Sequence, residues 1–153
     1  MNTTERNKAN FKRLLEEVIN EGRLDLADQL ITVDRPDHQE MGLPAEMTKG
    51  YAGFRTVIGM FREAFPDLRF TSQYMVAEGD LVVSYNLIEG THKGGFMGIP
   101  PTRKKFRATA ADVCRFNAEG KISEHWGVFD MFGLMVQLGV VPAPGQPAAA
   151  AGR

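Results

Sequence analysis

The hydrophobic pattern of this chain changes period once, near Leu68, and this change limits the available folds more than any other feature. Before Leu68, apolar residues recur at helical spacing, first in Phe11, Leu14, Leu15, Val18 and Ile19 and then in Phe54, Val57, Ile58, Phe61 and Phe65. This spacing places each set on one face of a helix. After Leu68, apolar and polar residues alternate, as in strands with one buried face. Helices followed by consecutive strands predict an α+β domain.

The residues before the change predict about three helices. Their ends are marked by residues that commonly cap or stop a helix: Thr3 or Thr4 before the first, Gly22 after it, Gly50 before the third and Pro66 after it. Arg23–Thr32 is expected to form a short second helix. Val33–Thr48 has no period and contains prolines and glycine, so it predicts a loop, with a short extended piece around residues 37–39.

The residues after the change predict four antiparallel strands, over Leu68–Val76, Leu81–Glu89, Lys105–Phe116 and Ile122–Asp130. Glu78–Asp80 and Asn117–Lys121 are tight turns, and Gly90–Arg103 is a long loop rich in Gly and Pro. Met131–Leu138 is a predicted closing helix that Gly139 ends. A twisted sheet with the helices on its concave side encloses a cone-shaped, mostly apolar pocket, which suits a small-molecule ligand.

Length and composition narrow the class of protein. The 153 residues fit one domain, expected over 1–141, followed by a Pro/Ala-rich tail over 142–153 that is expected to be disordered. The net charge of −1 disfavours nucleic acid or an anionic membrane as the main partner. No apolar run approaches the roughly 20 residues that span a bilayer, and the polar N-terminus predicts no signal peptide. The single thiol, Cys114, excludes an internal disulfide framework and suggests a reducing cytoplasm.

The last predicted strand carries the most informative carboxylate. Trp126, Val128 and Asp130 share one of its faces because strand side chains alternate. Asp130 is either a general base in a dry pocket or the cap of the helix that begins at Met131, and the pattern leaves both open. If Asp130 points inward, His125 points away from the pocket.

Other polar residues are weaker candidates. His92 lies in the long loop, where it either meets a developing oxyanion or is a surface residue, and His38 is placed to enter the pocket mouth. Asp112 and Cys114 share one strand face. Either this is the pocket face and Asp112 is a second acid there, or Asp112 is exposed and Cys114 belongs to the core. The three histidines lack the spacing of metal ligands, so no metal is expected.

Several stretches together resemble the SnoaL-like polyketide cyclases, also called ester cyclases. They are Ala64–Leu68, Gly90–Thr102, Asp112–Phe116 with Gly120–Ile122, Glu124–Trp126 with Asp130, and Gln137–Gly139. The similarity covers about residues 7–139, although the family often has Gly where Arg103 follows Thr102. The resemblance implies the nuclear-transport-factor-two-like cone fold and a cofactor-free intramolecular aldol condensation that closes a ring on an aromatic polyketide ester. It also implies that Asp130 is the acid/base.

These observations lead to one main expectation and two alternatives. The main one is a cyclase for a bulky, mostly apolar carbonyl compound, with Asp130 and His92 catalytic and with substrate contacts from His38, Asp112, Trp126, Phe61, Met97 and Cys114. The outer sheet face is expected to be covered in a homodimer or homotetramer. The first alternative is an isomerase or epoxide hydrolase on the same fold. It is disfavoured because epoxide opening needs a water held by an Asp-Arg-Asp type of network, and Arg115 is expected to face out. A non-catalytic ligand-binding protein would use Asp130 only as a cap.

Overall fold

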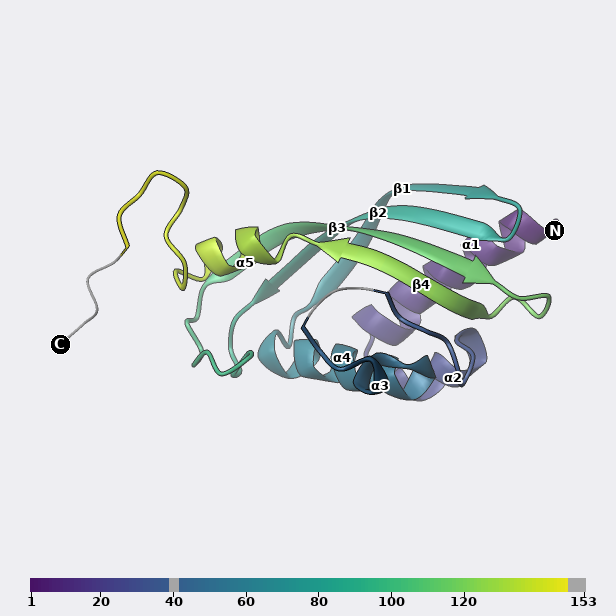
Figure 1. Cartoon of the computed structure of the whole chain (residues 1–153), viewed down its shortest axis with the longest axis horizontal. Helices are drawn as coiled ribbons and strands as arrows, with labels where there is room; N and C mark the ends of the chain where they lie inside the picture. The colour runs from purple at the N-terminus through teal and green to yellow at the C-terminus, as the bar shows by residue number, and fades with distance from the viewer. Residues whose placement is uncertain (39–41, 149–153) are drawn as a thin grey trace.

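The computed structural model describes residues 1–38 and 42–148, which form a layer of helices against one face of a four-stranded sheet (Figure 1). The helical segments are α1 (Thr3–Arg13), η1 (Leu14–Asn20), η2 (Leu24–Leu26), α2 (Ala27–Leu30), α3 (Ala45–Thr48), α4 (Gly50–Ala64) and α5 (Met131–Gln137). The strands are β1 (Arg69–Glu78), β2 (Leu81–Thr91), β3 (Lys105–Phe116) and β4 (Ile122–Phe129). The predicted α+β class is therefore confirmed.

The first helix differs from its prediction at both ends. Asn2, and not Thr3 or Thr4, is the N-cap, because its side chain accepts from the Glu5 amide while the Glu5 carboxylate accepts from the Asn2 amide. Beyond Arg13 the helix continues as the π-helical turn η1. The side-chain amide of Asn20 then bonds both backbone groups of Phe70, which ties the helix end to the edge strand β1.

The sheet is an antiparallel meander in the order β1-β2-β3-β4. Even-numbered residues of β2 and β3 face the helices, and most of them are buried. In β4, Phe116 pairs with Ile122 but Arg115 pairs with Glu124, so Ser123 is an extra residue in the ladder. This bulge reverses the alternation, so that Ile122, His125, Gly127 and Phe129 all face inward.

The predicted orientation of the last strand is therefore wrong. Trp126 and Val128 lie on the outer face, and the inward positions belong to their neighbours. Strict alternation correctly grouped Trp126, Val128 and Asp130, but a one-residue bulge decides which face such a group occupies.

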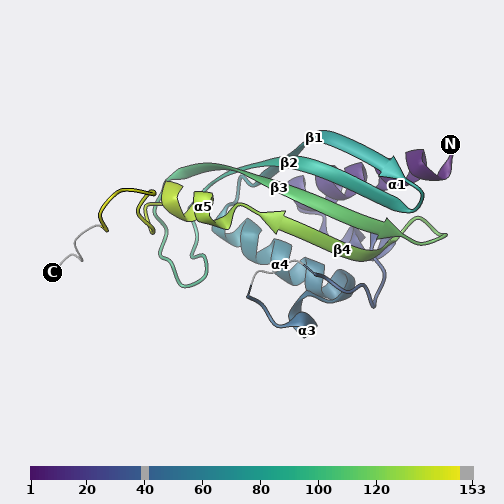
Figure 2. The same ribbon diagram turned by 45° about the horizontal axis from the view of Figure 1, so that its top comes forward.

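The helical segments that precede β1 lie together beneath the concave side of the sheet, whereas α5 lies at the end of the sheet where β4 stops (Figures 1 and 2). Aromatic contacts join the layers, with the Phe61 ring on α4 packing edge-on against Phe129 of β4. The region predicted as a loop over Val33–Thr48 contains the one-turn helix α3, and its extended piece is confirmed at Asp37, which bridges to β4. Gln39 of that piece lies outside the described residues.

The C-terminal segment beyond α5 leads away from the sheet in Figure 1. Residues 142–148 contain a turn and no helix or strand, and the rest of the predicted disordered tail, 149–153, lies outside the described part of the chain. None of the described helices is long and apolar enough to cross a membrane.

Candidate functional site

A largely apolar cavity of about 90 Å³ lies between the helices and the concave sheet face. Its helical wall includes Phe11, Leu14, Phe54, Ile58 and Phe61, and its sheet wall includes Ile88, Ala110, Cys114 and Phe129. Four charged or titratable polar side chains also line it: Arg35, Asp37, Asp112 and His125. They define a polar end in a cavity that is otherwise suited to hydrocarbon or aromatic surface.

His125 lies between two carboxylates at this polar end. Its Nδ1 is 2.9 Å from Asp37 Oδ1, and its Nε2 is 2.8 Å from Asp112 Oδ1. Burial alone lowers the pKa of His125, but hydrogen bonds and charge attraction from Asp112 and Asp37 outweigh it and raise the pKa to about 9. The imidazole is therefore an imidazolium at neutral pH, with both N–H groups donating to carboxylates.

Arg35 and Asp37 reach the cavity from the segment between α2 and α3. Arg35 Nη1 is 3.1 Å from Asp37 Oδ2, and its Nη2 donates to the backbone oxygens of Thr48 and Gly50 at 3.0 and 3.4 Å. The backbone of this segment pairs with β4, since the His38 amide donates to the His125 oxygen and the His125 amide donates to the Pro36 oxygen. The pairing places Asp37 beside His125.

Asp112 is held from its other side by a chain of hydrogen bonds. Asn86 Nδ2 donates to Asp112 Oδ2 at 2.7 Å, and Ser84 Oγ donates to Asn86 Oδ1 at 2.7 Å. Because the Ser84 hydroxyl proton is used in this way, Ser72 Oγ donates to Ser84 Oγ at 2.9 Å. The chain of hydrogen bonds therefore ends on the Asp112 carboxylate and fixes its orientation.

Gly127 leaves the space that the His125–Asp112 pair occupies. It lies opposite Asp112 in the ladder, and a Cβ at this position would lie 3.0 Å from His125 Cε1 and 3.1 Å from Asp112 Oδ1. A side chain here would have to displace the pair.

A model of the SnoaL-like polyketide cyclase family matches residues 9–138. The chain belongs to the SnoaL-like polyketide cyclase family. It is 30% identical over 123 residues to the nogalonic acid methyl ester cyclase of Streptomyces nogalater, which covers 78% of this chain and 88% of that relative.

Similar solved structures confirm the cone fold that the resemblance implied. IdmH from Streptomyces antibioticus, a proposed polyketide cyclase, has a TM-score of 0.75 at 33% identity, covering 88% of this chain and 99% of its own. AclR from Streptomyces galilaeus, a proposed hydroxylase, has a TM-score of 0.78 at 27% identity, covering 92% of this chain and 85% of its own.

Three of the predicted site residues of this SnoaL-like chain do line the cavity: Phe61, Asp112 and Cys114. Asp112 is the polar one, and it lies on the pocket face and not in solvent. Cys114 is fully buried, and burial raises the pKa of its thiol well above the usual range, with the Asp112 charge adding to the effect. It therefore contributes wall and not a nucleophile.

Asp130 is exposed and lies outside the cavity wall, which contradicts its predicted position. Its Oδ1 accepts from the Gly133 amide at 2.8 Å, so its side chain caps α5. The alternative interpretation of this residue, a helix cap at the end of the strand, describes what its side chain does. The orientation was wrong because the bulge at Ser123 had no sequence signal.

His92 is also absent from the cavity wall. Its ring is completely buried against Phe65, and its Nδ1 accepts from the Thr102 amide at 3.1 Å. The ring therefore fastens the two ends of the long loop to each other. The predicted contact of His92 with a substrate oxygen is not supported by this position.

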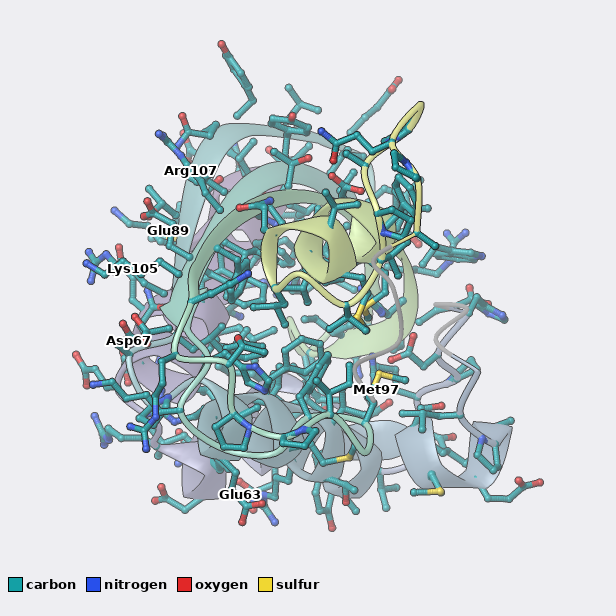
Figure 3. All side chains as sticks on the ribbon, turned by 90° about the vertical axis from the view of Figure 1, so that its left-hand side faces the viewer. Glu63, Asp67, Glu89, Met97, Lys105 and Arg107 are labelled. Carbon is teal, nitrogen blue, oxygen red and sulfur yellow. The ribbon has the colours of Figure 1, made fainter. Side chains whose placement is uncertain are left out.

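The remaining three predicted residues lie outside the main cavity. His38 stacks on Trp126 over the outer side of β4, and its Nε2 is 3.1 Å from Glu124 Oε2. Met97 is half exposed at the end of the molecule shown in Figure 3, where it lines a separate small apolar pocket together with Phe61. The predicted wall role of Trp126 is therefore wrong, and that of Met97 applies only to the neighbouring pocket.

Sequence reasoning missed Arg35 and Asp37 and set His125 aside. The available signal was the charged Asp34-Arg35-Pro36-Asp37 segment, in which an expected extended piece would pair its backbone with a strand edge. Among the residues that the structure describes, no group of three His, Cys, Asp or Glu side chains has the arrangement of a metal site.

Proposed function

We propose that this protein is a polyketide cyclase-like enzyme that closes a ring by intramolecular aldol condensation, with Asp112 as the acid/base. The observation that carries the proposal is the charged cluster at one end of an apolar cavity, in which His125 lies between Asp37 and Asp112. The substrate class is a bulky, mostly apolar compound with an activated methylene, of the kind named for the Streptomyces nogalater relative.

Asp112 is the best-placed base of the cluster. His125 is protonated at neutral pH and cannot accept a proton, and Arg35 remains charged. Asp37 is engaged by both Arg35 and His125. Among the described residues, Asp112 accepts from only one cationic side chain, His125, and its second partner is the neutral amide of Asn86, so it is less strongly neutralised than Asp37 while its orientation is still fixed.

The proposed reaction conserves all atoms. The Asp112 carboxylate removes a proton from a methylene between an ester and a ketone, which leaves an enolate. The enolate carbon forms a bond to a ring carbonyl carbon, and the carbonyl oxygen becomes an alkoxide. Protonated Asp112 returns the proton to this alkoxide, so the product is an isomer of the substrate and the sequence of steps needs no cofactor.

Epoxide hydrolysis is a second candidate because an arginine that was not expected there, Arg35, lines the cavity. Arg35 pairs with Asp37 near Asp112, whereas Arg115 faces outward and pairs with Asp80 and Glu124, as expected from its alternation. An Asp-Arg-Asp network would place the arginine between the carboxylates, but His125 occupies that position here. Aldol chemistry is therefore the better supported of the two.

Two matched substitutions test the assignment. Asp112→Asn removes the base and is expected to slow ring closure about 10²- to 10⁴-fold, whereas Asp130→Asn keeps a helix-capping side chain and is expected to retain the wild-type rate. Turnover is measured on nogalonic acid methyl ester and related aromatic polyketide esters, as conversion to a chromatographically distinct isomer of the same mass. Circular dichroism checks the fold of each variant.

The reverse result would reject Asp112 as the base. Full activity in Asp112→Asn together with loss in Asp130→Asn would return the role to the residue that the family resemblance implied. If an apolar epoxide is hydrolysed while no ester in the panel is cyclised, the second candidate is correct.

A further inference from the structure

The polar end of the cavity contains a buried hydrogen-bond donor with no acceptor. Arg35 is only 2% exposed, and both of its terminal nitrogens are engaged by Asp37 and by backbone oxygens. Its Nε is also buried but has no hydrogen-bond partner among the residues that the structure describes. An unsatisfied donor on a buried cation is costly, and proteins rarely retain one without a purpose such as ligand binding.

The charges around this donor are balanced before any ligand enters. Arg35 and His125 carry positive charge, and Asp37 and Asp112 carry negative charge. When Asp112 accepts a proton from a substrate, one negative charge moves from the carboxylate to a substrate oxygen. That oxygen then needs a cationic donor that is not already engaged.

His125 does not meet this need, because both of its N–H groups donate to carboxylates. Arg35 does, because its Nε–H is unpaired and its guanidinium is held by Thr48 and Gly50 oxygens of a different segment. A donor fixed in advance stabilises developing charge without reorganisation at the moment of reaction.

We propose that Arg35 Nε–H binds the enolate oxygen of the substrate, so that the polar end of the cavity is a subsite for a 1,3-dicarbonyl group in its enolate form. This inference rests on the proposed function and adds a ligand class to it. Arg35 stabilises the negative charge that Asp112 creates, and the apolar remainder of the cavity holds the rest of the molecule.

The probe is 1-phenylbutane-1,3-dione, a small aryl diketone that is not cyclised and whose enolate absorbs differently from its neutral form in the near ultraviolet. Binding to the wild-type protein is expected to lower the pH at which the diketone ionises. Arg35→Lys keeps the positive charge but has no N–H at the position of Nε. It is expected to weaken enolate binding about ten- to a hundredfold and to abolish most of the shift in ionisation.

Two further variants serve as references for this binding experiment. Arg55→Lys is the matched control, since Arg55 also donates to backbone oxygens, those of Leu24 and Asp25, and is not among the residues lining the cavity. It is expected to bind the enolate as the wild type does. Asp112→Asn removes a negative charge next to the subsite and is expected to bind the enolate more tightly than the wild type does.

Wild-type binding by Arg35→Lys would overturn the inference. If Arg35→Lys does not fold, the ¹⁵N-labelled wild-type protein is used instead, in which the Arg35 Nε–H signal should shift downfield when the diketone binds, and an unchanged signal would reject the contact. Arg35-dependent enolate binding without turnover of any polyketide ester would reject only the proposed function. Turnover with no dependence on Arg35 in either experiment would reject only the inference.

Discussion

Both ring nitrogens of His125 donate to carboxylates, and this arrangement fixes the charge of the residue. A neutral imidazole has one N–H, so it would leave either Asp37 or Asp112 facing a nitrogen lone pair. The raised pKa of about 9 is the result of this double acceptance, which outweighs the burial of the ring. The imidazolium thereby holds together two carboxylates that would otherwise repel each other in the cavity.

This pKa predicts how stability depends on pH. The folded-state pKa of about 9 is above the ordinary value of 6.5, so the stabilisation is fully present below about pH 6.5 and is lost as the pH rises through 9. The wild-type free energy of unfolding, measured with denaturant from pH 6 to 10, is expected to fall relative to that of His125→Gln by on the order of a few kcal/mol. Parallel pH dependence in the two proteins would contradict this assignment of charge.

Single residues of the site could be predicted only where the local pattern decides their orientation. Asp112 and Cys114 were correctly grouped on one face because β3 alternates without interruption, and the structure shows that this is the pocket face. Arg35 could not be placed, because its contacts with Thr48 and Gly50 depend on how the segment before α4 folds back. Such tertiary contacts have no period in the sequence.

At the level of elements, the strands and turns were predicted closely and the faces of β4 were not. The period-two runs and glycine-containing turns predict β3 to the residue and the other strands to within a few residues. The bulge at Ser123 has no such signal, since no glycine or proline marks it. One unmarked residue therefore decided whether His125 or Asp130 would enter the cavity.

Gly127 gives the next prediction, since it is the inward position of β4 beside the charged cluster. A Cβ in Gly127→Ala would lie 3.0–3.1 Å from His125 and Asp112 atoms, so these side chains must move. Turnover on the polyketide ester panel is expected to fall about tenfold or more, because catalytic groups tolerate little misplacement. Binding of the diketone to Gly127→Ala is measured alongside, because displacement of the His125 and Asp112 side chains would change its affinity too.

Gly59→Ala is the matched control, because the nearest atom to its new Cβ is Leu24 Cδ1 at 4.0 Å and the position lies within α4. It is expected to stabilise the protein by about 0.5–1 kcal/mol in thermal or denaturant unfolding and to leave turnover unchanged. Equal loss of activity in both variants would show that the effect of Gly127→Ala is not local.

At the scale of the whole molecule, the outer sheet face has a large apolar area. Tyr74, Val76 and Val128 are 74%, 64% and 69% exposed, and Val83 and Tyr85 lie on the same side. Charged residues such as Glu89, Lys105 and Arg107 project from the β2–β3 end of this face (Figure 3). An apolar patch with a charged rim is typical of a protein–protein interface, and the homodimer or homotetramer that would cover this face stays a prediction.

Substitution of two exposed valines of this face, Val83 on β2 and Val128 on β4, tests the predicted assembly. Val83→Lys with Val128→Lys is expected to convert an oligomer to a monomer, because two buried, unpaired charges per subunit would oppose association. Light scattering after size-exclusion chromatography measures the mass. Val33→Lys changes a similarly exposed valine in the segment between α2 and α3 and is expected to leave the mass unchanged; a monomeric wild type would reject the prediction.

The segment before α3 runs alongside β4 as an interrupted parallel partner, with bridges from Ile31 to Ile122 and from Asp37 to His125. It carries Arg35 and Asp37, so the same segment supplies part of the polar end of the cavity and covers the β4 edge of the sheet. A ligand that contacts Arg35 while this segment is paired with β4 must, by mass action, oppose detachment of the segment. Occupancy of the cavity and protection of the sheet edge are therefore thermodynamically linked, and each strengthens the other.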